Sequence, residues 1–330
     1  LFADGVENAR QLARGDSGTI FAGSREAGKV HAITDEDSDF VANRVYLVDQ
    51  GLNMPSGLEF RDGALYVGAV DRILRYDGIE QSLARPPEPV VVGAAFPDKS
   101  HHGWKYLRFG PDGLLYVPVG APCNICDEPG FAEIRRIRAD GTGMETFARG
   151  VRNSVGLDWA PWDDVLYATE NGRDLLGDDL PPDELNRIES NNFYGWPFVY
   201  GAGAPDPDFG AGHAAESARA VTPVHEFRAH HAPLGLAFMR GANLPAGYSR
   251  TALVALHGSW NRSQPDGYKV VALDWQPDGS IVERDFLTGF LGDAGVLGRP
   301  AGIAQGPDGA IFITDDYAGV IYRVVPATGS

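Results

Sequence analysis

The stretch Gly110-Pro-Asp-Gly-Leu-Leu-Tyr-Val117 decides the fold, because it joins a tight turn to a β-rich run and recurs along the chain. Proline presets φ at the second position of a type I turn and glycine suits the fourth position, so Pro-Asp-Gly reverses the chain into the next strand. Related stretches occupy residues 14–21, 61–67, 161–167 and 306–313. Each copy therefore predicts a β-hairpin.

The spacing of these turns indicates a repeated four-stranded unit. Successive turns in the first four copies lie about 46 to 51 residues apart, which is the span of a propeller blade. A second strand-like run follows most of the turns, at residues 28–33, 71–76, 132–137, 267–273 and 319–324. One further blade is expected around residues 251–256, together with a long loop insertion at about 172–231.

We therefore predict an all-β chain that forms one six-bladed β-propeller domain of four-stranded antiparallel blades over residues 1–330. No segment shows the sustained 3.6-residue period of an amphipathic helix. An up-and-down barrel or a sandwich is the structural alternative. In a propeller, loops from all blades meet at one mouth of the channel, so functional residues should be scattered along the chain near strand ends.

Charge and hydropathy exclude some partners. The formal net charge of -17 at pH 7 argues against nucleic acid and anionic membrane surfaces, because both require clustered Lys and Arg. No run of about 18 apolar residues exists to span a membrane. We expect a soluble protein that binds no nucleic acid and does not insert into a membrane.

Cys123 and Cys126 are the two cysteines of the chain. A zinc site would require about two further N or S ligands, and a thioredoxin-like pair would need a βαβ context. A local disulfide is favoured over a reduced structural pair, and both are favoured over metal or redox chemistry. A disulfide suits an oxidising compartment, so we expect a periplasmic or secreted protein whose signal peptide is not part of this sequence.

Arginines stand at corresponding places in several of the expected blades. Arg152 and Asn153 precede the inner strand of the fourth blade, and Arg25, Arg262 and Arg299 lie in the first and the later blades. Each arginine taken alone is more simply a surface ion pair. Together, in so acidic a chain, they predict a site for a multiply anionic small molecule, because guanidinium groups bind carboxylates in bidentate fashion.

Two histidine pairs and an acidic segment add to this pattern. His102 precedes the third turn and His230 precedes the fifth blade, so the two would place imidazole on opposite sides of a pocket. A single histidine is more often a structural side chain. Residues 170–186 are rich in carboxylates and contain Gly172, a composition that suits either a hard cation such as calcium or a solvated acidic loop.

Taken together, these motifs resemble the soluble pyrroloquinoline quinone (PQQ) dehydrogenases, which comprise soluble glucose dehydrogenase, aldose sugar dehydrogenase and the closer L-sorbosone dehydrogenase group. The resemblance extends over essentially the whole chain. Its most specific parts are residues 101–113, 150–153, 192–197, 257–262 and 298–300.

The resemblance implies a six-bladed propeller with PQQ over the channel mouth, a calcium ion under the quinone, and hydride transfer from a sugar hydroxyl to the quinone. An external electron acceptor would then reoxidise the cofactor. His102 falls on the position of the family's catalytic base, and the calcium-binding carbonyls would come from Gly172 and Arg173. The residues expected at the cofactor are Arg25, Arg152, Asn153, His230, Asn261, Arg262 and Arg299.

Three departures from the glucose dehydrogenase pattern favour the sorbosone and aldose branch. The aspartate that assists the base aligns with Ala121, and a second C-terminal arginine aligns with Ala301. The family's cofactor lysine has no secure equivalent, so Arg262 is expected to take its place. We do not expect glucose in particular to be the substrate.

Two other functions are compatible with a propeller. A calcium-dependent lactonase would place several Asp, Asn or Glu side chains around a metal at the mouth, with no need for convergent arginines. A non-enzymatic binding module would use an exposed rim and require no cofactor. Arginines outnumber the expected inward carboxylates in this sequence, which favours the dehydrogenase.

Overall fold

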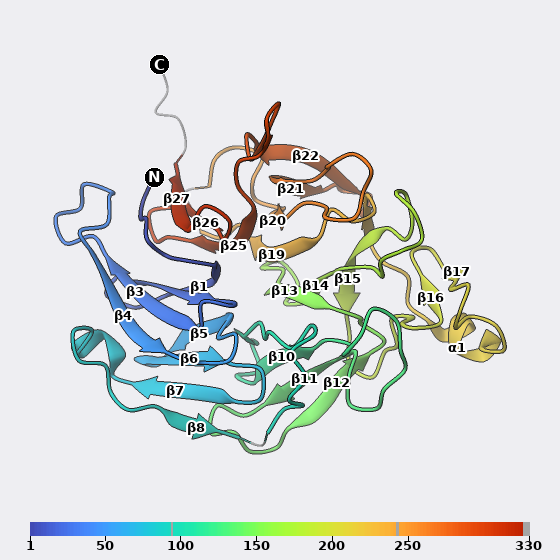
Figure 1. Ribbon diagram of the computed structural model, residues 1–330, viewed down its shortest axis with the longest axis horizontal. Coiled ribbons are helices and arrows are strands. Elements are labelled where there is room, and N and C mark those ends of the chain that lie inside the picture. The colour runs from blue at the N-terminus through green and yellow to red at the C-terminus, as the bar shows by residue number, and fades with distance from the viewer. Residues whose placement is uncertain (94, 242–243, 326–330) are drawn as a thin grey trace.

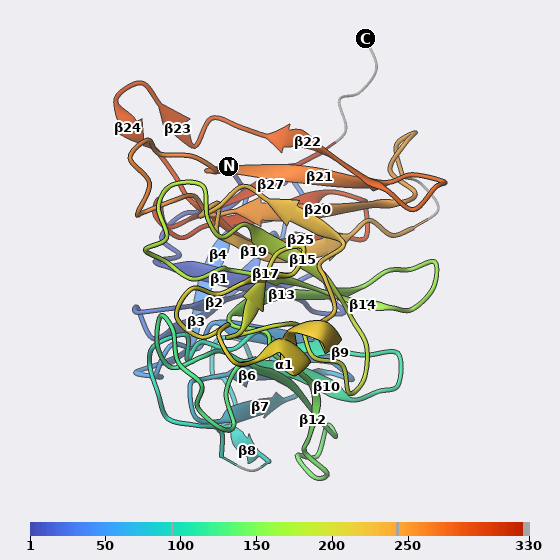
Figure 2. The ribbon, with the colours of Figure 1, turned by 90° about the vertical axis from the view of Figure 1, so that its right-hand side faces the viewer.

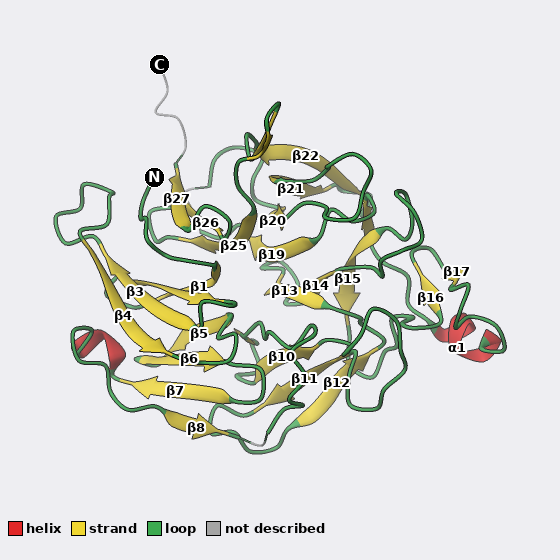
Figure 3. Ribbon diagram, in the orientation of Figure 1, coloured by secondary structure: helices red, strands yellow, loops and turns green. Residues whose placement is uncertain are grey.

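Six antiparallel sheets are arranged in a ring around a central axis (Figure 1). The computed structural model describes residues 1–93, 95–241 and 244–325. The predicted six-bladed, four-stranded propeller is confirmed, and Figure 3 shows that strands and loops make up nearly all of it.

The strands follow the chain from blade to blade. The first sheet consists of β1 (Ala9–Arg14), β2 (Ile20–Ser24), β3 (Lys29–Thr34) and β4 (Arg44–Gln50). The second consists of β5 (Gly57–Arg61), β6 (Ala64–Gly68), β7 (Ile73–Asp77) and β8 (Val90–Val92). The third consists of β9 (Arg108–Phe109), β10 (Leu115–Val119), β11 (Glu133–Ile137) and β12 (Glu145–Arg149). The fourth sheet consists of β13 (Ser154–Trp159), β14 (Leu166–Glu170), β15 (Asp183–Ile188) and β18 (His225–Phe227). The fifth consists of β19 (Pro233–Phe238), β20 (Thr251–Leu256), β21 (Lys269–Trp275) and β22 (Ile281–Leu287). The sixth consists of β25 (Pro300–Gln305), β26 (Ile311–Asp315) and β27 (Val320–Val324).

The Pro-Asp-Gly turns connect the first and second strands of their blades, as expected. Between β9 and β10, the Gly113 N–H donates to the Gly110 carbonyl at 2.9 Å, and Asp112 Oδ1 accepts from the Leu114 N–H at 3.0 Å. The turn between β25 and β26 repeats both bonds one for one, at 3.1 Å each. Gly113 has φ of 79°, a conformation that favours glycine.

The inner strands approach one another through glycines that face the next blade. A Cβ added at Gly57 would lie 2.8 Å from the Lys105 carbonyl oxygen, and one at Gly235 would lie 2.6 Å from that of Ala301. Gly156 and Gly302 meet the neighbouring backbone in the same way. The backbones of neighbouring blades therefore pack closely around the centre of the ring.

The ring is closed by the N-terminal segment. The sheet β25–β27 has three strands, and residues 2–6 run beside its outer strand β27. The Phe2 N–H donates to the Ile321 carbonyl at 2.8 Å, the Ile321 N–H donates to the Ala3 carbonyl at 2.9 Å, and the Val6 N–H donates to the Gly319 carbonyl at 2.9 Å. The first and last blades are thus held together by main-chain hydrogen bonds.

The interval about 172–231 differs from the expected loop insertion. It contains two strands of the fourth blade, β15 and β18, together with the hairpin β16 (Val199–Tyr200) and β17 (Ala204–Pro205). The alternation of β15 is hidden in the sequence because Asp183, Glu184 and Asn186 are polar yet buried.

Small additions lie at the periphery. They are the 3-10 helix η1 (Ile79–Gln81), the helix α1 (Ala214–Arg219), which lies on the outside of the ring, and the hairpin β23 (Leu291–Gly292) and β24 (Gly295–Val296), which projects from one side (Figure 2). Among the described residues, no helix has the length and apolar character that a membrane crossing requires.

Candidate functional site

A polar cavity of about 350 Å³ lies at the channel mouth where the inner strands begin. Its volume is in the range of small-molecule sites. The predicted residues in its wall are Arg25, His102, Arg152, Asn153, Gly172, His230, Asn261 and Arg299. They come from segments far apart in the sequence, which the converging inner strands bring to one place.

His102 is held as a neutral imidazole with one nitrogen free. Its Nδ1 lies 2.8 Å from the Ala121 carbonyl oxygen, so Nδ1 carries the proton and donates it. Burial, with Arg152 as the next contribution, holds the pKa of His102 well below its usual value. Nε2 is therefore an unprotonated acceptor on a side chain that lines the cavity. The Ala121 carbonyl therefore orients the ring at the position where the glucose dehydrogenase pattern has an aspartate and this chain, as noted from its sequence, does not.

Close packing fixes the position of His102 further. Its φ is 49°, and a Cβ added at Gly120 would lie 2.6 Å from the His102 Cβ. The ring packs edge-on against Trp104, with centroids 5.6 Å apart. The imidazole is therefore held from the side of Gly120, from Ala121 and from Trp104.

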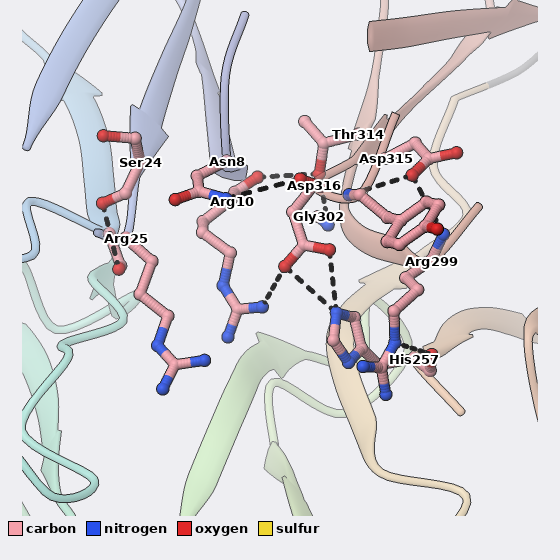
Figure 4. A network of polar contacts seen from close by, with 12 residues as sticks. Asn8, Arg10, Ser24, Arg25, His257, Arg299, Gly302, Thr314, Asp315 and Asp316 are labelled. Carbon is pink, nitrogen blue, oxygen red and sulfur yellow. Dashed lines mark hydrogen bonds and ion pairs between the residues drawn. The ribbon is translucent and has the colours of Figure 1, made fainter. Parts of the chain in front are cut away.

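One wall of the cavity is cationic. Arg10, Arg25 and Arg299 extend their guanidinium groups toward the same side in Figure 4. Burial lowers the pKa of Arg25, and Arg10 and Arg299 lower it further, which places three like charges close together. Arg25 Nε is buried without a hydrogen-bond partner among the described residues, and its guanidinium group stacks 4.4 Å over Trp104.

Asp316 compensates part of this charge. It accepts from Arg10 Nη1 at 2.6 Å and lies 2.8 Å from His257 Nε2 (Figure 4). Burial would raise the pKa of Asp316, but His257 and Arg10 outweigh it and hold that pKa well below the usual range. One carboxylate is thus shared by two groups, so the wall keeps an excess of positive charge that suits an anionic ligand.

Arg152 is directed at the protein and not at the cavity. Its guanidinium group donates to the carbonyls of Asn124, Asn171 and Gly172 at 2.9–3.0 Å and to Asn124 Oδ1 at 3.0 Å. Burial lowers the pKa of Arg152 to about 10, so it stays charged at neutral pH. Arg152 organises the loops of the cavity wall.

The opposite wall carries hydrogen-bond acceptors. Asp174 Oδ1 accepts from Asn261 Nδ2 at 2.8 Å, and His230 Nδ1 lies 3.9 Å from the same oxygen. Asp183 accepts from the N–H groups of Gly172 and Ala232 at 2.7 and 2.8 Å, and burial raises its pKa to about 7 despite these bonds. Asp183 therefore ties together two segments of this wall.

Two predicted residues do not line the cavity. Arg262 donates to the carbonyls of Asp178 and Ala229 and pairs with Asp179 at 3.4 Å. Arg173 pairs with Asp206 and Asp208 at 2.9 and 2.8 Å, so its side chain is committed elsewhere. Both arginines connect loops of the mouth.

Several wall residues were not predicted, namely Arg10, Trp104, Asn171, Asp174, Asp183, His257, Gly258 and Trp260. Arg10 had only a weak sequence signal, because it lies in the strand Ala9–Arg14, where Gln11 and Arg14 are polar as well. His257 and Trp260 lie in the motif 257–262, but the sequence does not show which of its side chains turn inward.

The disulfide between Cys123 and Cys126 is confirmed. It encloses Asn124, whose side-chain oxygen accepts from Arg152 Nη2 and from the Asp174 N–H at 2.9 Å. The disulfide therefore supports a loop that holds two residues of the cavity wall.

The wall fits PQQ but not the expected calcium site. Three arginines share the two carboxylates Asp316 and Glu26, and Arg25 Nε has no partner among the described residues, which matches a flat molecule with several carboxylates. The Gly172 carbonyl, in contrast, accepts from the Arg152 guanidinium, which repels a cation at that oxygen. In the described residues, the group of three His, Cys, Asp or Glu side chains close enough to share a metal is Asp35, Asp37 and Asp39, outside the cavity.

Comparisons with known proteins agree with this fold. A protein of Borreliella burgdorferi is 33% identical over 336 residues, covering 97% of this chain and 86% of that protein. The calcium structure of a Trichoderma reesei carbohydrate-active enzyme of family AA12 matches with a TM-score of 0.83 at 21% identity, over 97% of this chain and 93% of that one. The holo PQQ domain of a Coprinopsis cinerea pyranose dehydrogenase matches with a TM-score of 0.78 at 19% identity, over 97% and 93%.

The resemblance stated from the sequence motifs is confirmed, since the structural neighbours include soluble PQQ-dependent sugar dehydrogenases. The family model described as TrAA12-like matches residues 1–327. The chain belongs to the TrAA12-like family.

Proposed function

We propose that this protein is a PQQ-dependent dehydrogenase that oxidises a sugar of the aldose or sorbosone type. The observation that carries the proposal is the cluster of Arg10, Arg25 and Arg299 in one cavity with a buried, neutral His102. The arginine cluster suits an anionic redox cofactor, and His102 beside it suits a general base. A PQQ-bearing domain among the structural neighbours supports it.

The arginine wall would hold the cofactor. Arg25 Nε has no hydrogen-bond partner among the described residues, and Arg10 donates to Asp316 through Nη1, so further N–H groups of both arginines can donate to carboxylates. Arg299 is oriented by the carbonyls of His257 and Gly258. Asn153, His230 and Asn261 complete the surroundings, and Arg152 and Arg262 support them from behind.

His102 would act as the general base. Its Nε2 takes the proton of the sugar hydroxyl. The Ala121 carbonyl accepts a hydrogen bond from Nδ1–H throughout and so keeps the tautomer fixed. The bound quinone supplies a two-electron acceptor that takes the hydride from the same sugar carbon. The hydroxyl-bearing carbon becomes a carbonyl, and an external acceptor removes the electrons afterwards.

Calcium was expected from the resemblance, but no step of this mechanism uses it. Gly172 and Arg173 were expected to provide its ligands, yet Arg152 already uses the Gly172 carbonyl. A lactonase is not favoured, because the cavity wall brings Arg10, Arg25 and Arg299 together and has only the two carboxylates Asp174 and Asp183 among its described residues. We also propose a periplasmic or secreted location, supported by the Cys123–Cys126 disulfide.

A two-part experiment tests the proposal. PQQ is titrated into the quinone-free protein, with and without calcium, and aldoses and sorbosone are then added while the reduced-quinone spectrum is followed. We expect His102→Gln to bind PQQ as the wild type does but to reduce it about 100-fold or more slowly. Failure of the wild type to bind PQQ, or an unchanged rate in the variant, would contradict the proposal.

A further inference from the structure

A second cavity, of about 360 Å³, lies where the inner strands end, whereas the candidate site lies where they begin. Among the described residues, none lines both cavities. On β1, Gln11 stands between Arg10 of the first cavity and Leu12 of the second. It donates to the Leu107 carbonyl at 2.7 Å and accepts from the N–H groups of Leu58 and Leu107 at 3.0 Å, so it joins three inner strands at this level. The second cavity is therefore a separate site.

Two arginines are held in fixed positions at this cavity by one carboxylate. Asp158 accepts from Arg108 Nε at 3.1 Å and Nη2 at 2.9 Å, and from Arg240 Nη1 and Nη2 at 2.7 and 2.8 Å. Burial would raise the pKa of Asp158, but Arg108 and Arg240 outweigh it and lower that pKa. Gln305 binds the main chain of Arg240, with its Oε1 and Nε2 each 2.9 Å from their partner. Both guanidinium groups are thus ordered, and both remain partly exposed.

Arg14 adds a third positive charge to this wall. It is exposed at the end of β1 and lines the cavity, and within the described residues its side chain forms no hydrogen bond or ion pair. Glu59 is a further carboxylate of the wall, and its contact with Arg108 Nη1 is 3.4 Å long. Burial raises the pKa of Glu59 to about 7, although Arg108 favours its ionised form. Three guanidinium groups therefore stand against Asp158 and a partly protonated Glu59, which leaves an excess of positive charge.

The rest of the wall is largely apolar. Leu12, Ala237 and Ile303 come from the first, fifth and sixth blades, line the cavity and are otherwise buried. Phe60 and Pro307 lie beside them. A ligand here can lose water from an apolar body at one side and meet guanidinium N–H donors at the other.

We propose that this second cavity binds a small organic carboxylate that has an apolar body. The carboxylate lies at Arg14 and Arg108, and the body packs against Leu12, Ala237 and Ile303. A guanidinium group matches a carboxylate with two parallel hydrogen bonds, and the side chain of Arg14 is free to make them. Inorganic anions and sugars lack the apolar body, so they fit only part of this wall. The proposal goes beyond the proposed function and does not depend on it.

Fluorine NMR titrations on the whole protein test this site. The probe is 4-fluorophenylacetate, with 4-fluorophenylacetamide as its neutral match and acetate as a competing carboxylate without the body. We expect the acid to bind with a Kd of about 1 mM or lower, and the amide and acetate to bind about tenfold more weakly. No binding of the acid, or an equal affinity for the amide or for acetate, would overturn the proposal.

Three variants locate the bound acid. Arg14→Gln should weaken binding about fivefold or more, because it removes a charge-assisted pair of hydrogen bonds. Arg85→Gln is the matched control, since Arg85 is exposed on the segment between η1 and β8 and lines neither cavity. Arg299→Gln removes a guanidinium group from the candidate site and should leave the affinity for the acid unchanged. Equal affinities in Arg14→Gln and Arg85→Gln, or a loss in Arg299→Gln, would show that the acid does not bind in the second cavity.

The pH dependence of the affinity gives a second readout through Glu59. The charged and titratable groups around Glu59 are Arg108, Asp158, Arg240 and Tyr106. Burial raises the pKa of Tyr106 and the arginines lower that of Asp158, so Glu59 is the member of this group that changes charge between pH 6 and pH 8. Its ionised form repels a bound carboxylate, so the affinity should fall about threefold or more from pH 6 to pH 8 in the wild type and stay constant in Glu59→Gln. The same change with pH in both proteins, or none in either, would contradict the position of the carboxylate beside Glu59.

Discussion

His102 shows how a backbone carbonyl can replace a side chain in the support of a base. The Ala121 carbonyl oxygen lies 2.8 Å from His102 Nδ1 and accepts its hydrogen bond, so the tautomer does not depend on the residue type at position 121. A carbonyl also brings no negative charge, in contrast to an aspartate. Burial and Arg152 are therefore free to keep the pKa of His102 low, and the ring stays unprotonated into the acid range.

This low pKa predicts the pH dependence of the reaction. A general base must be unprotonated, so kcat/KM should stay constant as the pH falls from 8 through 6.5, the usual histidine pKa, and should decline only below that. The measurement is a pH profile of kcat/KM for the PQQ-loaded enzyme. A decline centred at pH 6.5 or above that is absent from the residual activity of His102→Gln would show that burial does not govern this histidine.

Gly120 gives a test of how His102 is positioned. A methyl group at Gly120 would lie 2.6 Å from the His102 Cβ and 2.7 Å from its carbonyl oxygen, so Gly120→Ala should displace the base. We expect a loss of kcat of about 100-fold with PQQ binding retained, because a small misplacement of a base is enough to lower the rate strongly.

Gly292→Ala is the matched control for this variant. A Cβ at Gly292 would lie 3.1 Å from the flexible tip of Leu297 and 3.9 Å from the Gly295 carbonyl oxygen. It should leave activity near the wild-type value. A Gly120→Ala protein as active as Gly292→Ala would mean that His102 adapts without loss.

At this scale, residue types could be predicted but side-chain directions could not. Arg152, Arg262 and Arg299 were all expected at the cofactor, and their motif positions in the sequence look equivalent. Arg262 is used by the carbonyls of Asp178 and Ala229, which belong to loops whose path the sequence does not reveal. Arg10 was missed because Gln11 and Arg14 of the same strand are also polar, so the sequence does not single out the residue that reaches the mouth.

Among the elements, β15 illustrates why the interval 172–231 was expected to be a loop. Its residues Asp183, Glu184 and Asn186 face the interior, so the hydrophobic alternation that identifies strands is missing. Asn186 Nδ2 bridges the carboxylates of Glu170 and Glu184 at 3.1 and 2.9 Å. The polar strand is supported by these bonds to Asn186, and Glu170 of the adjacent strand β14 also accepts from the backbone N–H of Arg152.

The Glu170–Glu184 pair makes this element sensitive to pH. Burial raises the pKa of Glu184 to about 7, from a usual value near 4.5. A raised folded-state pKa contributes stability that is present below the unfolded pKa and lost as the pH rises through 7. Glu184→Gln cannot ionise, so its melting temperature relative to wild type should increase from pH 5 to pH 8, by about 2 °C or more.

Thermal melts at several pH values measure this difference. Glu189→Gln is the control, because Glu189 is half exposed and pairs with Arg187 at the surface, and its difference from wild type should not depend on pH. If Glu184→Gln shows the same flat difference, Glu184 is ionised at no cost in the folded protein.

For the whole molecule, the ring was predictable from local signals because each blade repeats the same turn. The Pro-Asp-Gly turns at Asp112 and Asp308 form the same hydrogen bonds, although they lie in different blades far apart in the chain. A second repeat was overlooked: Gly57, Gly156, Gly235 and Gly302 each face the backbone of the next inner strand. These glycines lack a side chain that a hydrophobic pattern could register, although they set how closely the blades approach.

Closure of the ring was beyond the reach of sequence reasoning. Residues 2–6 carry no turn motif or long alternating run, and their partner β27 lies at the other end of the chain. Their position follows from the need of β27 for a neighbour, since an open edge exposes unpaired N–H and C=O groups. The cationic wall depends on this closure, because Arg10 and Arg25 come from the first blade and Arg299 and Asp316 from the last.

Phe2 is the side chain with which the N-terminal segment anchors this closure, so its removal should destabilise the whole ring. It is buried and packs edge-on against Phe312, with ring centroids 4.9 Å apart. Phe2→Ala should cost about 3–5 kcal/mol of unfolding free energy and lower the melting temperature by about 5–10 °C, whereas Leu1→Ala should change neither, because Leu1 is exposed. Since opening of the seam separates Arg10 from Arg299, the affinity for PQQ should fall in Phe2→Ala at temperatures well below its melting point. Equal melting temperatures and PQQ affinities for the two variants would show that hydrogen bonds alone close the ring.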